Sequence, residues 1–307
     1  MLGFALRRLF GVVPTFLLIV AAAFFIMRAA PGGPFDDERT LPPEIEANLQ
    51  AAYGLDQPLP VQFARYLGGL VRGDLGPSYR MKDFTVAELI GRGLPVTLSI
   101  GAAALALALL LGIPLGLAAG LRQNGWADHA VMSVALAGIA IPNFVVAPVL
   151  ALLFGLQLGW LPVAGWEPGS LRHMVLPVIT LALPLVAYLA RLTRGSLLEV
   201  LQSPFIRTAR AKGLAPGVIL RRHALKPTLL PVVSFLGPAA AGLLTGSLVV
   251  EQVFGLPGVG RYFVQGAINR DYTLVMGMVV FYAALILLLN LVVDLAYGWL
   301  DPRIRHD

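Results

Sequence analysis

The stretch SPFIRTARAKGL, from Ser203 to Leu214, is the most informative part of the chain, because it is a short basic segment between two long apolar ones. Ser203 is a favoured N-cap residue, Pro204 suits the first helical position, and Gly213 can end a helix in the left-handed conformation. A helix is therefore predicted over 203–213. Its cationic side chains keep it out of the hydrocarbon, so a partner outside the bilayer can push it. Phe205 and Ile206 give the helix an apolar surface to press into that partner. This arrangement indicates a transporter subunit whose motor lies on another chain.

The composition predicts an all-α integral membrane protein. The chain is 57% hydrophobic and 13% charged, with a mean hydropathy of +0.78. About 20 apolar helical residues cross a bilayer core of ~30 Å, so each long uncharged run is a candidate span. Six spans are predicted, in the runs Leu9–Met27, Gly93–Leu121, Ala130–Trp166, Met174–Ala190, Pro227–Val250 and Tyr272–Val293. The third run is too long for one crossing, and Pro162, Gly165 and Trp166 indicate its exit loop.

The predicted spans divide the chain into four parts. Residues 1–8 form the N-terminus, 9–27 the first transmembrane helix, and 28–92 a large structured outer loop. Residues 93–307 form the core of the chain, with helices 2–6 and a basic loop at 191–226.

The outer loop is expected to contain amphipathic helices. Leu41–Glu44 can open one helix, and Thr85–Glu88 is a capping box that leads towards the second span. An apolar stripe at helical spacing indicates another helix. Such helices either dock a soluble partner, lie on the outer membrane surface, or pack over the bundle. The stripe consists of Phe63, Tyr66, Leu67, Leu70 and Val71.

The distribution of lysine and arginine predicts that both termini are cytoplasmic. With six spans the termini share one side, and the short loops and ends on that side carry 13 Lys or Arg residues. The opposite short loops carry only 3, namely Arg172, Arg261 and Arg270. An excess of positive charge marks the cytoplasmic side. The net charge of +6 is therefore an effect of membrane orientation and does not indicate nucleic-acid binding.

The sequence offers no chemistry of its own for energy coupling or catalysis. It has no cysteine, its four histidines are scattered, and it lacks HExxH, GxSxG and P-loop motifs. We therefore expect no enzyme activity, no metal and no cofactor, and ATP would be hydrolysed on partner subunits. Asp294 is the one ionisable residue expected near a span between the first and sixth helices, which disfavours a self-sufficient secondary carrier.

Two glycine-rich patterns indicate close packing and a turn. Gly112, Gly116 and Gly120 repeat a small-xxx-small spacing that marks a helix interface, either internal or with another subunit. The turn-rich loop 251–260 could dip back towards the bundle and close an outer gate, or it could be a plain connection. The candidate gate residues are Glu251, Phe254, Gly255, Pro257, Gly258 and Gly260.

The segment 203–231 resembles the coupling loop of permeases in binding-protein-dependent ABC importers. That loop carries the residues EAA, three further residues, and a glycine. Arg207-Thr208-Ala209 stands in the EAA place and Gly213 in the glycine place. The glutamate is missing, but RTARAKG is the version typical of the peptide and nickel branch. The later Leu-Pro of the pattern is altered to Leu225-Lys226-Pro227.

Further segments along the whole chain resemble the B-type permease of oligopeptide importers. RTLPPE and the long first outer loop favour an oligopeptide cargo over a dipeptide or nickel. These segments are Met1–Pro34, RTLPPE at Arg39–Glu44, RGDLGPSY at Arg72–Tyr79, IPNFVVAP at Ile141–Pro148, FGLPGVG at Phe254–Gly260 and NRDY at Asn269–Tyr272.

The resemblance implies a type I ABC importer permease fold in the bacterial inner membrane. It implies a homologous second permease, two cytoplasmic ATPase subunits that bind ATP and Mg, and a periplasmic or lipid-anchored peptide-binding protein. A dipeptide or nickel importer of the same design remains an alternative, and a secondary transporter is the alternative from another class. The loop 251–260 would serve as outer gate or binding-protein dock.

The resemblance also assigns candidate site residues. The expected ATPase-coupling residues are Ser203, Phe205, Arg207, Thr208, Ala209, Arg210, Lys212 and Gly213. Polar candidates for the wall of the path are Asn143, Ser234, Thr245, Ser247 and Asn290, although each could equally bond to a neighbouring helix.

Overall fold

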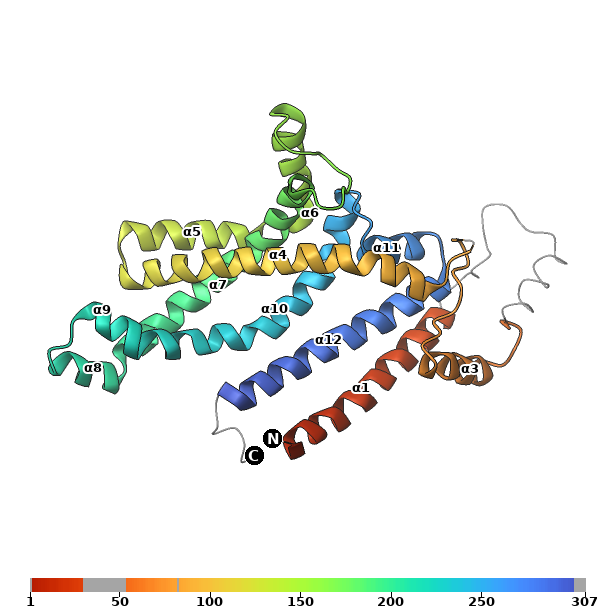
Figure 1. Ribbon diagram of the computed structural model, residues 1–307, viewed down its shortest axis with the longest axis horizontal. Coiled ribbons are helices and arrows are strands. Elements are labelled where there is room, and N and C mark those ends of the chain that lie inside the picture. Colours follow the sequence, from red (N-terminus) through yellow and green to blue (C-terminus); the bar gives the residue numbers. More distant parts are fainter. Residues whose placement is uncertain (1, 30–53, 82, 301–307) are drawn as a thin grey trace. The chain divides into compact units, whose positions relative to one another are not determined.

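The computed structural model describes residues 2–29, 54–81 and 83–300, and these ranges are almost entirely helical (Figure 1). Within them the one strand-like pairing is an isolated bridge between Pro77 and Thr85. The prediction of an all-α protein is confirmed. The helices are α1 (Leu2–Ala29), α3 (Leu59–Val71), α4 (Val86–Leu121), α5 (Trp126–Ala140), α6 (Asn143–Leu150), the π-helix η1 (Ala151–Gln157), α7 (Leu171–Gln202), α8 (Pro204–Ala211), α9 (Pro216–Val218), the π-helix η2 (Ile219–Ala224), α10 (Leu225–Val253), α11 (Val259–Ile268) and α12 (Tyr272–Leu300).

The chain forms two compact units. Of the described residues, the first unit contains those up to Val96 together with Pro257–Leu291, and the second contains Thr97–Leu256 and the end of α12 from Val292 onward. The boundary at Val96 falls inside α4, so this helix contributes to both units. The predicted coupling loop 191–226 lies entirely in the second unit.

The number of candidate spans agrees with the predicted six. Among the described residues, five helices are long and apolar enough to cross a membrane, and a bent helix pair gives a sixth if it is one span. The pair is α5 followed by α6 and η1, with a bend of 101°. The break falls at Ile141-Pro142, where Ile141 adopts an extended conformation because the proline ring disfavours a helical residue before it. The break divides the third apolar run into two helical parts, which agrees with the prediction that the run is too long for one straight crossing.

Most predicted helix boundaries differ in the structure, and three helices illustrate the reason. The helix α7 is longer at both ends than the apolar run Met174–Ala190. The helix α4 begins at Val86, so it takes up the end of the predicted outer loop 28–92. The helix α10 continues to Val253, which places Glu251 on the helix and not in the following loop. In each case the helix continues past the first charged residue, because a charge ends an apolar run without ending a helix.

The first unit is built around contacts of α3 with α1 and α12. Val20, Phe24, Met276 and Val280 are buried together, and Phe63, Tyr66, Leu67 and Leu70 of the predicted stripe pack against them. This confirms packing over the bundle for that face of α3. Val71 was wrongly included in the stripe, since it is 89% exposed. The segment Leu41–Glu44 lies outside the described residues.

The capping box at the start of α4 is confirmed. The backbone N–H of Thr85 donates to Glu88 Oε2 at 2.9 Å, and the N–H of Glu88 donates to Thr85 Oγ1 at 3.2 Å. The two side chains thereby satisfy N–H groups that the first turn of a helix leaves free.

The glycine repeat forms an interface inside the second unit. A Cβ on Gly112 would lie 2.8 Å from Leu189 Cβ, and one on Gly120 would lie 2.9 Å from Leu197 Cδ2. Gly116 meets Ala190 and Thr193 in the same way. The three glycines therefore let α4 approach α7 closely, and the partner helix of the repeat belongs to this chain.

Candidate functional site

The centre of the candidate site is α8, which lies between the end of α7 and η2 in the second unit (Figure 1). Ser203 separates α7 from α8 in an extended conformation, with ψ 152°. Pro204 occupies the first helical position, where its missing N–H costs no helical hydrogen bond. Ser203 holds the N-cap position as predicted, but its side chain does not cap α8. Its Oγ donates to Val200 O at 2.6 Å and so closes the end of α7.

Gly213 ends α8 as predicted. It adopts φ +73°, in the left-handed region that favours glycine. The N–H of Gly213 donates to Arg210 O at 2.9 Å, and the N–H of Leu214 donates to Ala209 O at 3.3 Å. This pair of hydrogen bonds is a Schellman motif, which fixes the direction in which the chain leaves the helix.

One face of α8 is buried within its own unit. Ile206 is fully buried, and it packs with Ala209, Leu197 of α7, and Ile219 and Ala224 of η2. The expectation that Ile206 presses into a partner is therefore wrong, and Ala209 is also 6% exposed. Both residues bind α8 to its own chain.

The other face of α8 is open. It carries five of the eight residues that the resemblance assigns to ATPase contact, of which one is aromatic, one has a hydroxyl and three are cationic. These exposed residues are Phe205, Arg207, Thr208, Arg210 and Lys212. The hydroxyl of Thr208 donates to Pro204 O of the same helix at 3.1 Å. The aromatic and cationic side chains are exposed on a helix whose opposite face is packed in the core.

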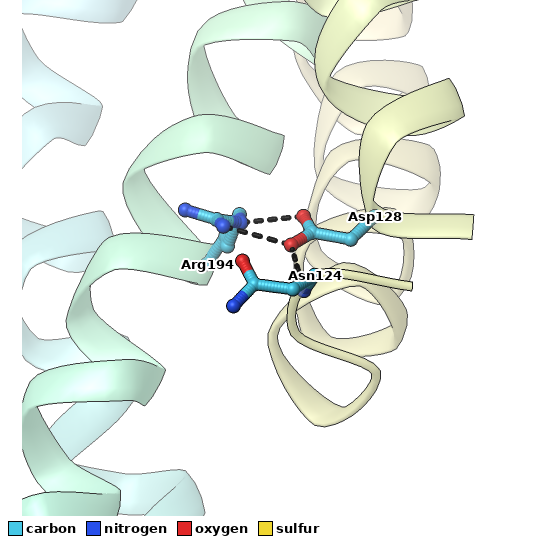
Figure 2. A network of polar contacts seen from close by, with 3 residues as sticks. All are labelled: Asn124, Asp128 and Arg194. Carbon is cyan, nitrogen blue, oxygen red and sulfur yellow. Dashed lines mark hydrogen bonds and ion pairs between the residues drawn. The ribbon is translucent and has the colours of Figure 1, made fainter. Parts of the chain in front are cut away.

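A partly buried ion pair lies one helical turn before this anchor. Figure 2 shows Arg194 of α7 facing Asp128 at the start of α5. Arg194 Nε donates to Asp128 Oδ1 at 2.5 Å, and its second nitrogen donates to Asp128 Oδ2 at 2.8 Å. The backbone N–H of Asn124 donates to Oδ2 at 2.9 Å, which also ties the turn between α4 and α5 into the network. Such bidentate geometry is the strong form of a charge-assisted hydrogen bond.

The ion pair was missed by sequence reasoning. In the sequence, Arg194 counts only as one of the cytoplasmic cations, and Asp128 plays no part in the prediction. The structure shows that Asp128 is only 1% exposed. The available signal was an isolated acid in a short basic loop between two apolar runs. The related expectation that Asp294 is the one ionisable residue near a span is wrong, because Asp128 and Glu251 are both buried on candidate spans.

The predicted outer-gate residues are more buried than a docking surface would be. Glu251 and Phe254 are 0% and 1% exposed. Thr97 Oγ1 donates to Glu251 Oε1 at 2.8 Å, which joins α4 to α10. Phe254 O accepts a hydrogen bond from the N–H of Gly165 at 2.8 Å, so the end of α10 is pinned to the exit loop after η1.

Of the remaining gate residues, Gly255, Pro257 and Gly258 lie in the turn before α11, whereas Gly260 lies in the first turn of α11. Gly255 has φ +62°, and Gly258 is the extended N-cap residue of α11. Gly258 and Gly260 are buried within the first unit, and a Cβ on Gly93 would lie 2.8 Å from the Gly258 carbonyl carbon. Pro257 is half-buried.

The candidate path residues have different local surroundings. Ser234 Oγ and Ser247 Oγ donate to carbonyls of their own helix, at Leu230 and Leu244. Asn143 begins α6 after the break, and its buried Oδ1 has no hydrogen-bond partner within the described parts of the chain. Asn290 is exposed, and the side chain of Thr245 lies outside the described residues.

Two family models match the chain. The model described as "Binding-protein-dependent transport system inner membrane component" matches residues 112–306, which include the whole of the candidate site. Its N-terminal counterpart, "Binding-prot-dependent transport system membrane comp, N-term", matches residues 1–101.

Curated relatives are similar over the full length. The chain is 50% identical over 306 residues to the oligopeptide transport system permease protein OppB of Escherichia coli K12, covering 100% of both chains. It is 48% identical to OppB of Haemophilus influenzae, again over 100% of each. The dipeptide transport system permease protein DppB of Bacillus subtilis is 43% identical, covering 99% of this chain and 98% of the relative.

A solved structure shares the fold. A chain from inward-facing conformations of the MetNI methionine ABC transporter matches with a TM-score of 0.59. At 20% identity the match covers 69% of this chain and 96% of that chain. This similarity concerns the fold alone, which is the type I ABC importer permease fold that the sequence predicted.

Proposed function

The chain belongs to the family of binding-protein-dependent transport system inner membrane components, and we propose that it forms half of the path of an ATP-driven oligopeptide importer. It is a membrane permease subunit. We place it in the bacterial inner membrane with both termini in the cytoplasm, since basic residues gather at that side of the predicted spans. Its partners would be a second, homologous permease, two ATPase subunits and a peptide-binding protein.

The observation that supports an oligopeptide cargo is identity along the entire chain. The match to OppB of E. coli has 50% identity, whereas the match to DppB of B. subtilis has 43%. A dipeptide importer of the same design is therefore the second candidate. Peptides share a backbone and termini but differ in side chains, so a weakly selective and largely neutral passage suits them.

We assign ATPase contact to the exposed face of α8. Arg207, Arg210 and Lys212 offer charge-assisted contacts to an acidic or polar groove, and Phe205, 48% exposed, offers an apolar anchor. The opposite face is held in the core by Ile206, and the Schellman motif fixes the end of the helix. A push on α8 therefore moves it as a rigid body together with the end of α7.

The route of this push runs through α7. Arg194 lies one turn before Leu197, which packs on Ile206, so the motion of α8 reaches the Arg194–Asp128 pair directly. The pair then moves the start of α5, whose far end meets the break at Ile141-Pro142. We propose that this break is where the second unit changes shape during transport.

The outer end of α10 would supply part of the gate. Glu251 and Thr97 join α10 to α4, and Phe254 joins it to the exit loop. These contacts lie between elements that must separate if the path is to open outward. A binding-protein dock would then use neighbouring exposed residues, since Glu251 and Phe254 are buried.

The proposal is tested by ATP hydrolysis in nanodiscs. The chain would be reconstituted with the second permease, the ATPases and the binding protein encoded beside it, and hydrolysis measured with and without loaded binding protein. Stimulation by tri- to pentapeptides is the expected result. Stimulation only by dipeptides or a nickel complex would replace the cargo and keep the machine. Solute uptake without any bound ATPase would contradict the proposal.

A further inference from the structure

A cavity of about 240 Å³ with both apolar and polar lining residues lies in the first unit, between the end of α1, the helix α3 and the start of α12. Phe24, Tyr66 and Met276 form its apolar base, which is continuous with the core of this unit. Arg28, Gln62 and Arg65 also line it, and these residues belong neither to the exposed face of α8 nor to the candidate outer gate.

The cavity lies beside the end of the apolar stretch of α1, where a membrane boundary is expected. The apolar stretch of α1 runs from Phe10 to Ala29, and Arg28 is in its last turn. In the same turn Ile26 is 71% exposed and Phe25 is 42% exposed, so an apolar surface continues from the cavity down the helix. A molecule in the cavity can therefore be polar at one end and contact hydrocarbon at the other.

Two polar atoms of the lining residues are buried without a partner among the described residues. Gln62 is 8% exposed, and its Nε2 donates to Leu55 O at 3.0 Å and to Gln57 O at 2.7 Å. Because both amide hydrogens are used, the orientation of the amide is fixed, and Gln62 Oε1 is left as an acceptor without a donor. The hydroxyl of Tyr66 also lacks a partner. Native structures rarely leave such groups unsatisfied.

The other polar lining groups favour an anion. Arg65 donates to Gln57 Oε1 at 2.7 Å, and a Cβ on Gly54 would collide with its guanidinium, so glycine is needed there for the arginine to lie as it does. Arg28 lies over the Phe24 ring at 5.4 Å. Burial raises the pKa of Tyr66, so its hydroxyl remains a proton donor at neutral pH. The single acid of the lining, Asp74, accepts from the N–H of Gly76 at 2.8 Å.

We propose that this cavity binds the headgroup of phosphatidylethanolamine from the leaflet around the end of α1. The phosphate would accept hydrogen bonds from Arg28, Arg65 and the hydroxyl of Tyr66, while the ammonium donates to Gln62 Oε1. The acyl chains would follow the exposed face of α1 at Ile26. A short peptide also carries an ammonium and an anionic group, but it lacks the apolar tail that this face accommodates.

The test is native mass spectrometry of the full-length chain, released from nanodiscs with equal amounts of phosphatidylethanolamine, phosphatidylglycerol and phosphatidylcholine. We expect phosphatidylethanolamine to be retained about tenfold over phosphatidylcholine, which has no N–H donor for Gln62. Tyr66→Phe removes one hydroxyl and keeps the ring, and we expect it to lower retention about tenfold. Arg28→Gln should lower it similarly.

Arg72→Gln is the matched control, because Arg72 is an exposed arginine beside α3 that does not line the cavity. This variant should retain the lipid as the wild type does. Thermal unfolding in detergent separates binding from folding: added phosphatidylethanolamine should raise the Tm of the wild type and not that of Tyr66→Phe. An equal shift in both would overturn the proposal.

Three other outcomes would also overturn it. Equal retention of phosphatidylglycerol would show that only the anion is recognised. Displacement of the lipid by a tripeptide at millimolar concentration would identify a peptide site instead. Equal loss of lipid in Arg72→Gln would reduce the effect to general surface charge.

Discussion

Arg194 and Asp128 meet in a bidentate ion pair that joins α7 to the start of α5, with N···O distances of 2.5 and 2.8 Å (Figure 2). The aspartate side chain is 2% exposed and the arginine 26%. Asp128 also lies in the first turn of α5, where a negative charge is favourable to the helix dipole. The pair lies one turn from the core of α8, so it is placed to make α5 follow the coupling helix.

Separating the pair should uncouple α5 from α8. Arg194→Gln leaves a buried carboxylate without its cation, which costs about 3 kcal/mol of stability in comparable sites. We expect a lower Tm and a loss of peptide-stimulated ATP hydrolysis in nanodiscs. Arg194→Lys should recover part of each, because lysine keeps the charge but cannot form the bidentate contact.

The control for this experiment is Arg191→Gln, since Arg191 is an exposed cation on the same helix that lies over Tyr188 at 5.7 Å. It should leave both readouts near wild type. In a double-mutant cycle, Asp128→Asn combined with Arg194→Gln should be less damaging than the two single effects added together. Additive effects would mean that the two residues act separately.

The left-handed end of α8 depends on Gly213. At φ +73° a β-branched residue is strained by about 1–2 kcal/mol, whereas asparagine tolerates this conformation. Gly213→Val should therefore reduce ATPase binding and transport, and Gly213→Asn should be close to wild type. Pull-down of the ATPase by the purified permease measures the effect. Gly217→Val is the control, because Gly217 has an ordinary φ and open space around it.

The exposed and buried faces of α8 should respond differently to a charge. Arg210→Glu reverses the sign of an exposed contact, so we expect ATPase binding to fall at least tenfold while the Tm stays unchanged. Ile206→Asp places a charge in the buried core and should lower the Tm first. Co-purification and thermal unfolding, measured together, distinguish the two. If Arg210→Glu bound the ATPase normally, α8 would not be the contact face.

Much of this fold could be predicted from the sequence, because its local signals are strong. Apolar runs of spanning length gave the number of spans. The stretch from Ser203 to Gly213 gave the position and both ends of α8. The chemistry of the capping residues and of Gly213 acts within a few residues, so it is readable without tertiary structure.

The rest depended on contacts that are distant in sequence. Ile206 appeared available for a partner, because the sequence does not reveal that Leu197 and Ile219 cover it. Asp128 and Glu251 were overlooked or misplaced, because their partners, Arg194 and Thr97, lie 66 and 154 residues away. A buried acid in a span is costly alone and acceptable once paired, and the pairing appears only in the structure.

Substituting alanine for a glycine of α4 should raise or lower the Tm, depending on which atoms face that glycine. A methyl group on Gly116 meets Ala190 and Thr193 of α7, so Gly116→Ala should cost about 1–3 kcal/mol through overpacking. Gly101 has no atom within 4 Å of its would-be Cβ. Gly101→Ala should instead stabilise the helix by up to about 1 kcal/mol, since alanine is the better helix former. Opposite shifts of Tm in the two variants would verify the interface, and equal shifts would contradict it.

The contact between Thr97 and Glu251 allows the outer-gate proposal to be tested at one hydroxyl. Thr97→Val keeps the shape of the side chain and removes one hydrogen-bond donor to the buried Glu251, which costs about 0.5–1.5 kcal/mol for a typical hydrogen bond. Thr97→Ser keeps the hydroxyl and serves as the control. If this contact holds α4 to α10 only when the path is closed, Thr97→Val should raise ATP hydrolysis without peptide, because the closed state loses stability relative to the open one. A lower Tm with unchanged basal hydrolysis would mean that the contact is present in both states, and it would then stabilise the bundle without gating it.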